Sequence, residues 1–121
     1  MLLDSNIIIY MAEPGYDSMK RFIGGQKTVA SVVSRIEVLG YHRLTSHSRE
    51  KLENAFRVLS VLPVSDPIIE RAIALRQQRR MSLGDALIAA TALEHGLKLA
   101  TANTNDFNWI EGLDVVNPVV R

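Results

Sequence analysis

Four acidic side chains stand beside apolar segments, where an ordinary surface carboxylate is not expected. In chain order they are Asp4, Glu37, Asp85 and Asp106. If the fold gathers them, each pair of charges repels by on the order of 4 kcal/mol at about 4 Å and an effective dielectric near 20. A bound cation would offset that repulsion, so these carboxylates predict a metal site.

Each of the four also has an ordinary structural interpretation. Asp4 could cap a helix that begins two residues later, because its carboxylate can accept bonds from the first free amides. Two segments, Ser34–Glu37 and Ser82–Asp85, match the Ser-x-x-acid capping box that marks many helix starts. Asp106 could cap the short helical turn that follows it. Taken singly, none of these acids indicates a function.

The apolar residues around two of the acids favour the functional interpretation. Glu37 falls inside an apolar stripe at the helical period, formed by Val33, Ile36, Gly40 and Leu44. That position predicts a Glu37 side chain that points inward. Asp85 is the only charge between Gly84 and Leu93, on a helix apolar enough to be buried on all sides. A buried carboxylate without a partner is costly, so it needs a cation or hydrogen-bond donors.

Strands alternating with helices must position these residues. We expect short strands at residues 1–3, 28–31, 61–64, 97–101 and 115–116. We expect helical segments at residues 7–11, 17–23, from 34 onward, 48–59, 66–80 with Asp66 as its N-cap, 84–95 and 106–110. This alternation predicts an α/β fold with a parallel sheet covered on both faces. In such sheets ligands bind beyond the carboxyl ends of the strands, which places Asp4 and the loop 102–106 at one edge.

Composition bounds the class of protein. The 121 residues are 47% apolar, which suits a single domain over residues 1–121. The chain has no cysteine, which excludes thiolate zinc sites and disulfides and fits the cytoplasm. We expect neither a signal peptide nor a membrane span. The net charge of +1 is too small to indicate a nucleic-acid partner by itself.

Basic residues gather near two of the acids. Before Asp85 stand Arg71, Arg76, Arg79 and Arg80, and around Glu37 stand Arg35, His42, Arg43, His47, Arg49 and Lys51. From the charges alone, solvated helix faces are the favoured interpretation. The alternative is a basic rim around an acidic pocket, as a polyanion would require, with Arg79 and Arg80 as candidate RNA contacts.

Four motifs follow one another along the chain: LLDSN, SRIEVLG, SLGDALIAATALEHG and LATANTNDF. In this order they resemble the motifs of PIN-domain ribonucleases, and more narrowly those of the VapC toxins of toxin–antitoxin pairs. The resemblance implies a three-layer α/β/α sandwich with a short, mainly parallel sheet. It implies RNA cleavage dependent on Mg²⁺ or Mn²⁺, with Asp4, Glu37 and Asp85 as catalytic and metal-binding residues. It further implies a homodimer and a small antitoxin that blocks the pocket.

The fourth acidic position departs from the family pattern. Many members carry aspartate two residues after the threonine that ends the late strand, and this chain has Asn103 there. Asparagine can ligate a metal through its carbonyl oxygen but supplies no charge, so either Asn103 or Asp106 completes the site. Ser5 and Asn6 match the small polar residues that follow the first aspartate, and we expect them to orient Asp4.

The residue types suggest a mechanism and leave alternatives open. Mg²⁺ is usually held by one or two carboxylates plus substrate phosphates, so Asp4 and Asp85 are the expected principal ligands, with Glu37 ligating or holding a water. An activated water would then attack the phosphodiester, leaving a 5′-phosphate and a 3′-hydroxyl. A catalytically weak RNA-binding module is the nearest alternative, because of Asn103. A receiver-like Mg²⁺ phospho-signalling domain is less favoured, since the chain lacks an early acidic pair.

Overall fold

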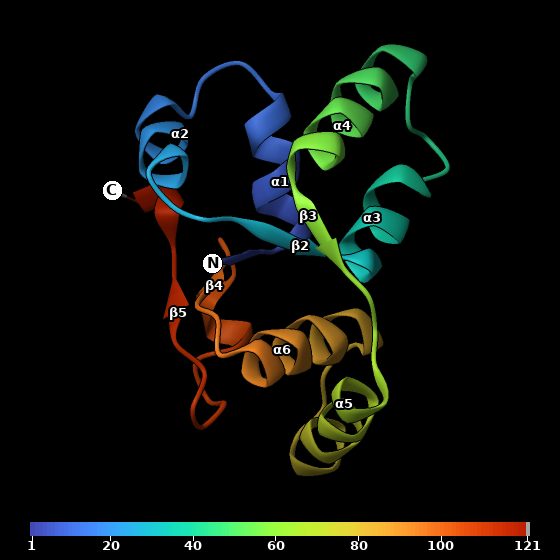
Figure 1. The fold of residues 1–121 in the computed structure, drawn as a ribbon, viewed down its shortest axis with the longest axis vertical. Helices are drawn as coiled ribbons and strands as arrows, with labels where there is room; N and C mark the ends of the chain where they lie inside the picture. The colour runs from blue at the N-terminus through green and yellow to red at the C-terminus, as the bar shows by residue number, and fades with distance from the viewer. Residues whose placement is uncertain (121) are drawn as a thin grey trace.

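The strands predicted from the sequence form one parallel sheet. The structure, a computed structural model, describes residues 1–120. The strands are β1 (Leu2–Leu3), β2 (Val29–Ser31), β3 (Ser60–Leu62), β4 (Leu99–Ala100) and β5 (Val115–Val116), and all neighbouring pairs are parallel (Figure 1). Their order is β3-β2-β1-β4-β5. Receiver domains have the order 2-1-3-4-5, so the receiver-like alternative is wrong.

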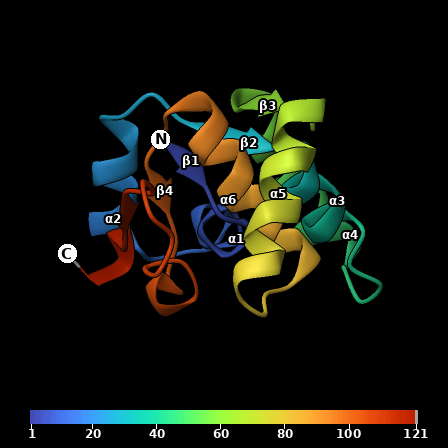
Figure 2. The ribbon, with the colours of Figure 1, turned by 90° about the horizontal axis from the view of Figure 1, so that it is seen from below.

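Helices cover both faces of the sheet. They are α1 (Ser5–Ala12), α2 (Asp17–Gly24), α3 (Val32–Leu39), α4 (Ser46–Val58), α5 (Asp66–Gln78) and α6 (Leu83–His95), with 3₁₀ turns η1 (Thr104–Asp106) and η2 (Pro118–Val120). Helices α1 to α4 lie on one face, and α5 and α6 on the other (Figures 1 and 2). This is the predicted three-layer α/β/α sandwich. No helix of the described residues is long and apolar enough to cross a membrane.

Two separate apolar cores explain why the strands are apolar throughout. Successive side chains of a strand point to opposite faces. Leu2 packs with α5 and α6, whereas the next residue, Leu3, packs with α1, α2 and α4. Leu99 and Ala100 divide in the same way on β4. Because both faces are covered, the strands do not alternate between apolar and polar residues.

Helix α6 begins and ends as the sequence predicts, apart from one residue. The Ser82 hydroxyl accepts a bond of 3.1 Å from the Asp85 amide, which is the expected N-cap. Gly96 closes the helix with a φ of 62°, a left-handed conformation that glycine adopts without steric cost. The cap holds Asp85 in the first helical turn.

Helix α3 begins earlier than the sequence predicts, so the interpretation of Ser34–Glu37 as a capping box is wrong. The N-cap is Ser31, whose hydroxyl accepts from the Val33 amide at 3.0 Å. Strand β2 runs directly into the helix, and Ser31 at its end takes the capping role. Ser34 therefore lies inside the helix, where it is buried.

The remaining helix boundaries differ by smaller amounts. Asp66 is the first residue of α5 and not its N-cap; Ser65 holds that position and makes no side-chain bond to the described residues. The helix ends at Gln78, two residues before the predicted end. Helix α4 begins at Ser46, because the Thr45 hydroxyl caps it by accepting from the Ser48 amide at 3.2 Å.

Candidate active site at the carboxyl ends of two central strands

Asp4 follows β1 and is fixed by hydrogen bonds from two elements. Its Oδ1 accepts from the Ser5 amide at 2.8 Å, so Asp4 does cap α1. Its Oδ2 accepts from the Thr101 hydroxyl, just after β4, at 2.7 Å. The Asn103 amide in turn donates to the Thr101 oxygen at 3.0 Å. Asp4 is only 6% exposed, so it is both a cap and a buried carboxylate.

Burial and hydrogen bonding act in opposite directions on Asp4. Burial raises the pKa of this carboxyl above its ordinary value, and the charge of Asp106 adds to that effect. The bonds from Thr101 and Ser5 favour the charged form and hold the pKa down. The Thr101 hydroxyl thus stabilises an anion that burial disfavours. This role of Thr101 was not predicted, because its only signal in the sequence is a threonine at the end of a late strand.

Glu37 does not point into the core as predicted. The buried side chains of α3 are Ser34 and Val38, whereas Ile36, a member of the expected apolar stripe, is 67% exposed. Glu37 is itself exposed. The stripe failed as a guide because the helix begins at Val32 and buries a serine, which no hydrophobic pattern detects.

Ser5 connects Glu37 to the Asp4 segment. Its hydroxyl lies 2.9 Å from Glu37 Oε1 and 3.0 Å from the Ser34 hydroxyl. A carboxylate only accepts, so the Ser5 hydroxyl donates to Glu37. The Ser5 backbone amide orients Asp4 and its side chain orients Glu37. The sequence predicted that both Ser5 and Asn6 orient Asp4.

Gly84 gives Glu37 access to the start of α6. A Cβ at this position would lie 2.6 Å from Glu37 Oε2, closer than real contacts allow. The absence of a side chain therefore brings the carboxylate of α3 against the first turn of α6, one residue before Asp85. The sequence offers one signal for this contact: Gly84 lies in the first turn of a helix, where the backbone conformation does not require glycine.

Asp85 is the residue whose pKa the other acids raise most clearly. The pKa of Asp85 is raised to about 6, first by burial and then by the charges of Asp4, Asp106 and Glu37, against a bond from Ser82 that lowers it. The charges of the three other predicted carboxylates therefore all act on Asp85. Helix α6 is not buried on all sides, since Leu83 is 59% exposed and Asp85 is half-buried.

Asp106 and Asn103 approach the site from the segment after β4. Asp106 is exposed and lies within η1, so it does not cap the turn that follows, as one interpretation predicted. The Trp109 indole donates to the Asp106 carbonyl at 3.0 Å and thereby holds the turn. Asn103 lines the groove described next, and Asp106 acts through its charge on Asp4 and Asp85.

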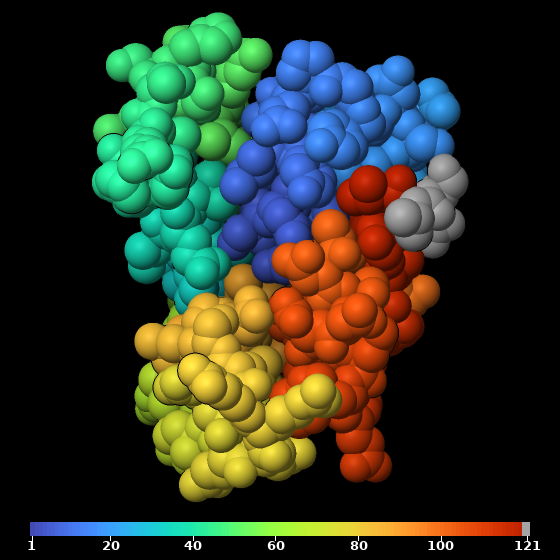
Figure 3. All heavy atoms as spheres, turned by 180° about the vertical axis from the view of Figure 1, so that it is seen from behind, coloured from blue at the N-terminus to red at the C-terminus, as the bar shows by residue number. Residues whose placement is uncertain are grey.

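A groove of about 740 Å³ opens over the acids. Asp4, Glu37 and Asp85 line it together with Ser5, Asn6 and Asn103. It continues between α1 and the segment from α3 to α4, which appear as neighbouring blue and cyan-to-green walls in Figure 3. The Asn6 Oδ1 atom is buried and has no hydrogen-bond partner among the described residues.

These residues could bind a hard divalent cation with only a few protein ligands. Among residues 1–120, no three acidic or histidine side chains are grouped closely enough to hold an ion. Mg²⁺ needs no such cage, because it usually keeps several waters and binds one or two carboxylates. Asp4 and Asp85 provide carboxylates in the groove, and Asn6, which also lines it, has a buried amide oxygen without a partner among the described residues. All these donors are oxygens, the type that Mg²⁺ prefers.

The arginines considered as RNA contacts lie outside the groove. The Arg79 guanidinium lies 5.4 Å from the centre of the Trp109 ring, a cation–π contact. Neither Arg79 nor Arg80 is among the residues that line the groove. Through Trp109, Arg79 supports the turn that carries Asp106.

Comparisons with known proteins identify the family of this chain. The family model of the PIN domain matches residues 1–112. The chain is 30% identical over 127 residues to ribonuclease VapC1 of Rickettsia felis, covering 96% of this chain and 94% of that protein. It is 34% identical over 123 residues to ribonuclease VapC10 of Mycobacterium tuberculosis, covering 93% and 90%.

A solved structure extends the likeness to three dimensions. The chain resembles one in a toxin–antitoxin complex from Klebsiella pneumoniae with a TM-score of 0.80 and 32% identity, covering 97% of this chain and 96% of that one. The family predicted from the four motifs is therefore confirmed. This chain belongs to the PIN-domain family and is of the VapC type.

Proposed function

We propose that this protein is a Mg²⁺-dependent endoribonuclease. The observation that carries the proposal is that burial and three neighbouring carboxylates raise the pKa of Asp85 to about 6, at the edge where ligands of parallel sheets bind. Two relatives named as ribonucleases support RNA as the substrate. Mn²⁺ has the same preference for oxygen ligands and would substitute.

Each residue of the site has a separate part in the proposed reaction. Asp4 and Asp85 would hold the cation, which when bound supplies polarisation of the phosphate and a lowered pKa of water. Ser5 and Thr101 fix the two oxygens of Asp4 before substrate arrives. Glu37, oriented by the Ser5 hydroxyl, lies at the opposite wall, where it can accept a proton from an attacking water.

The proposal includes protein partners. The resemblance to a chain of a toxin–antitoxin complex supports a role as the toxin of such a pair, with an antitoxin that covers the groove. We also propose a homodimer, in which a second copy of the chain would cover the exposed apolar side chains of Ile69, Ile73 and Leu83.

The native complex provides the test of this function. The protein is purified with whatever partner accompanies it, the partner is stripped off, and total RNA is incubated with each form. We expect cleavage only after stripping and only with Mg²⁺ or Mn²⁺, with EDTA abolishing it. Intact RNA under all these conditions would contradict the proposal.

The residues at the fourth acidic position favour a second candidate function, RNA binding without efficient cleavage. Asn103 supplies no charge where an acid is common in the family, and Asp106 is exposed. A catalytically weak RNA-binding module would result if these two residues fail to complete the site. Such a module would bind RNA without cutting it in the experiment above. Asn103→Asp would then create metal-dependent cleavage.

A further inference from the structure

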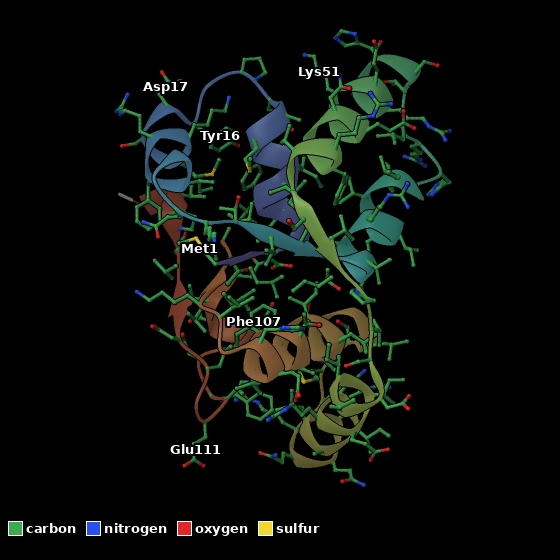
Figure 4. All side chains as sticks on the ribbon, in the orientation of Figure 1. Met1, Tyr16, Asp17, Lys51, Phe107 and Glu111 are labelled. Carbon is green, nitrogen blue, oxygen red and sulfur yellow. The ribbon has the colours of Figure 1, made fainter. Side chains whose placement is uncertain are left out.

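The groove has two ends of opposite charge. Asp4, Glu37 and Asp85 lie at one end, and at the other the segment from α3 to α4 contributes Arg43 and Lys51. Among the described residues, neither cation has an ion pair. Figure 4 shows Lys51 on the side of α4 that faces α1. The outer surface of α4 differs, since Arg49 pairs there with Glu53 at 2.9 Å.

Neighbouring groups keep this basic end suited to an anion. Glu13 also lines the groove, at the end of α1, so two cations face one carboxylate there. Thr45 and Ser48, at the start of α4, line it too, and the N-terminus of that 13-residue helix adds partial positive charge. Tyr41, which is 53% exposed, adds an aromatic face beside Arg43.

A polyanionic substrate needs these charges. A cation bound at the acidic end would offset the repulsion between the carboxylates and the phosphate that is cut. The flanking phosphates would still be repelled by these carboxylates. Helix α1, which forms one wall, has eight residues and is therefore about 12 Å long. Because RNA carries one phosphate per nucleotide, a strand that follows this wall brings phosphates on either side of the cleaved bond into the groove.

We propose that Arg43 and Lys51 hold backbone phosphates that flank the cleaved bond of a single-stranded RNA. The inference rests on the proposed function and adds the path of the substrate: the strand runs along α1, from the carboxylates to the start of α4. Single strands suit this path, because their unstacked bases can lie against an aromatic face such as Tyr41.

Binding can be measured apart from cleavage. In an Asp85→Asn background, the dissociation constant of a fluorescein-labelled single-stranded RNA is measured over a range of salt concentrations. Each lost phosphate contact lowers the slope of log affinity against log salt by about 0.7. We expect Arg43→Gln and Lys51→Gln each to weaken binding and lower the slope by that amount, and the double variant to lower it by about twice as much.

Arg49→Gln is the matched control. It removes the same charge from the same helix, but its guanidinium pairs with Glu53 and does not line the groove. We expect its slope to stay within the error of the parent. In the background that retains Asp85, Arg43→Gln and Lys51→Gln should raise KM and leave kcat unchanged.

The outcomes separate this inference from the proposed function. If the unmodified protein cuts RNA but the double variant keeps the parental slope and KM, the inference is wrong and the function stands. If the unmodified protein cuts nothing, the function fails, and the salt slopes still decide whether Arg43 and Lys51 bind RNA. Loss of antitoxin binding with unchanged RNA binding would overturn the inference, because the basic end would then serve a protein partner.

Discussion

At the scale of single residues, the carboxylate of Asp85 destabilises the folded protein, although the proposed function requires it. Its pKa is raised from 3.8 to about 6 by burial and by three other carboxylates. The folded protein thus binds more protons than the unfolded chain between these values. Stability contributed by this group therefore falls as pH rises from about 4 to about 6, and stays low above that.

Asp85→Asn should therefore stabilise the protein in the absence of metal. At pH 7.5 in EDTA we expect a gain of about 1 kcal/mol in the free energy of unfolding, discounted because the side chain is only half-buried. At pH 3.5, below both values, the aspartate is mostly protonated in both states, so most of the gain should disappear. Urea unfolding at the two pH values measures both. A variant less stable than the parent at pH 7.5 would show that the carboxylates do not repel one another.

Substitution of Thr101 tests whether its hydrogen bond to Asp4 contributes to the proposed activity. Thr101→Val keeps the size of the side chain and removes the donor to Asp4 Oδ2. We expect cleavage to fall by about 10- to 100-fold, the usual cost of losing a group that orients a metal ligand. The acidic limb of the pH–rate profile should also move to higher pH, because burial would then raise the pKa of Asp4 without this opposing bond.

Thr101→Ser is the control, since it restores the hydroxyl. It should recover most of the rate and the original pH profile. Equal activity of the valine and serine variants would refute a positioning role.

At the scale of elements, the contact between α3 and α6 depends on Gly84. In Gly84→Ala the new Cβ would displace the Glu37 carboxylate, which can move because it ends a flexible side chain. We therefore expect a folded protein, with stability unchanged or higher because alanine favours the helix. Cleavage should fall, as measured by initial rates on one RNA.

Gly24→Ala is the matched control for that substitution. A Cβ at Gly24 meets no atom within 4 Å, so rate and stability should both be retained. A full rate in Gly84→Ala would show that the position of Glu37 is not critical.

The strands and α6 were predictable because local signals agree with the tertiary structure. The strands are apolar on both faces, and α6 has a serine cap at one end and a glycine at the other. Helix α3 was not, because Ser34 looks like a cap but lies buried within the helix. The burial of Glu37 was mispredicted for the same reason.

The candidate site was predictable to a similar extent. The acids themselves stand out against apolar neighbours, and a parallel sheet explains why Asp4 and the loop after β4 meet. The roles of Ser5, Thr101 and Gly84 depend on contacts between segments far apart in the chain. No local pattern records such contacts.

At the scale of the whole molecule, the site joins the two layers of helices. Asp4 and Glu37 come from the layer of α1 and α3, and Asp85 comes from α6 across the sheet. A cation bound between Asp4 and Asp85 would therefore resist separation of the layers. At 100 times its dissociation constant, Mg²⁺ should stabilise the protein by about 2.7 kcal/mol.

Thermal unfolding in a Mg²⁺ titration measures this linkage. Asp4→Asn and Asp85→Asn should each lose most of the stabilisation, whereas Asp114→Asn, a distant surface acid paired with Lys98, should keep it. Equal stabilisation of all four proteins would place the ion elsewhere.

The rate of RNA cleavage by the unmodified protein and by Asp85→Asn, with Mg²⁺ and with EDTA, tests the central claim most directly. The carboxylate site predicts cleavage by the unmodified protein only with Mg²⁺, and a loss of at least about 100-fold in Asp85→Asn, which we expect to fold. Cleavage that persists in EDTA, or an Asp85→Asn protein as active as its parent, would contradict it.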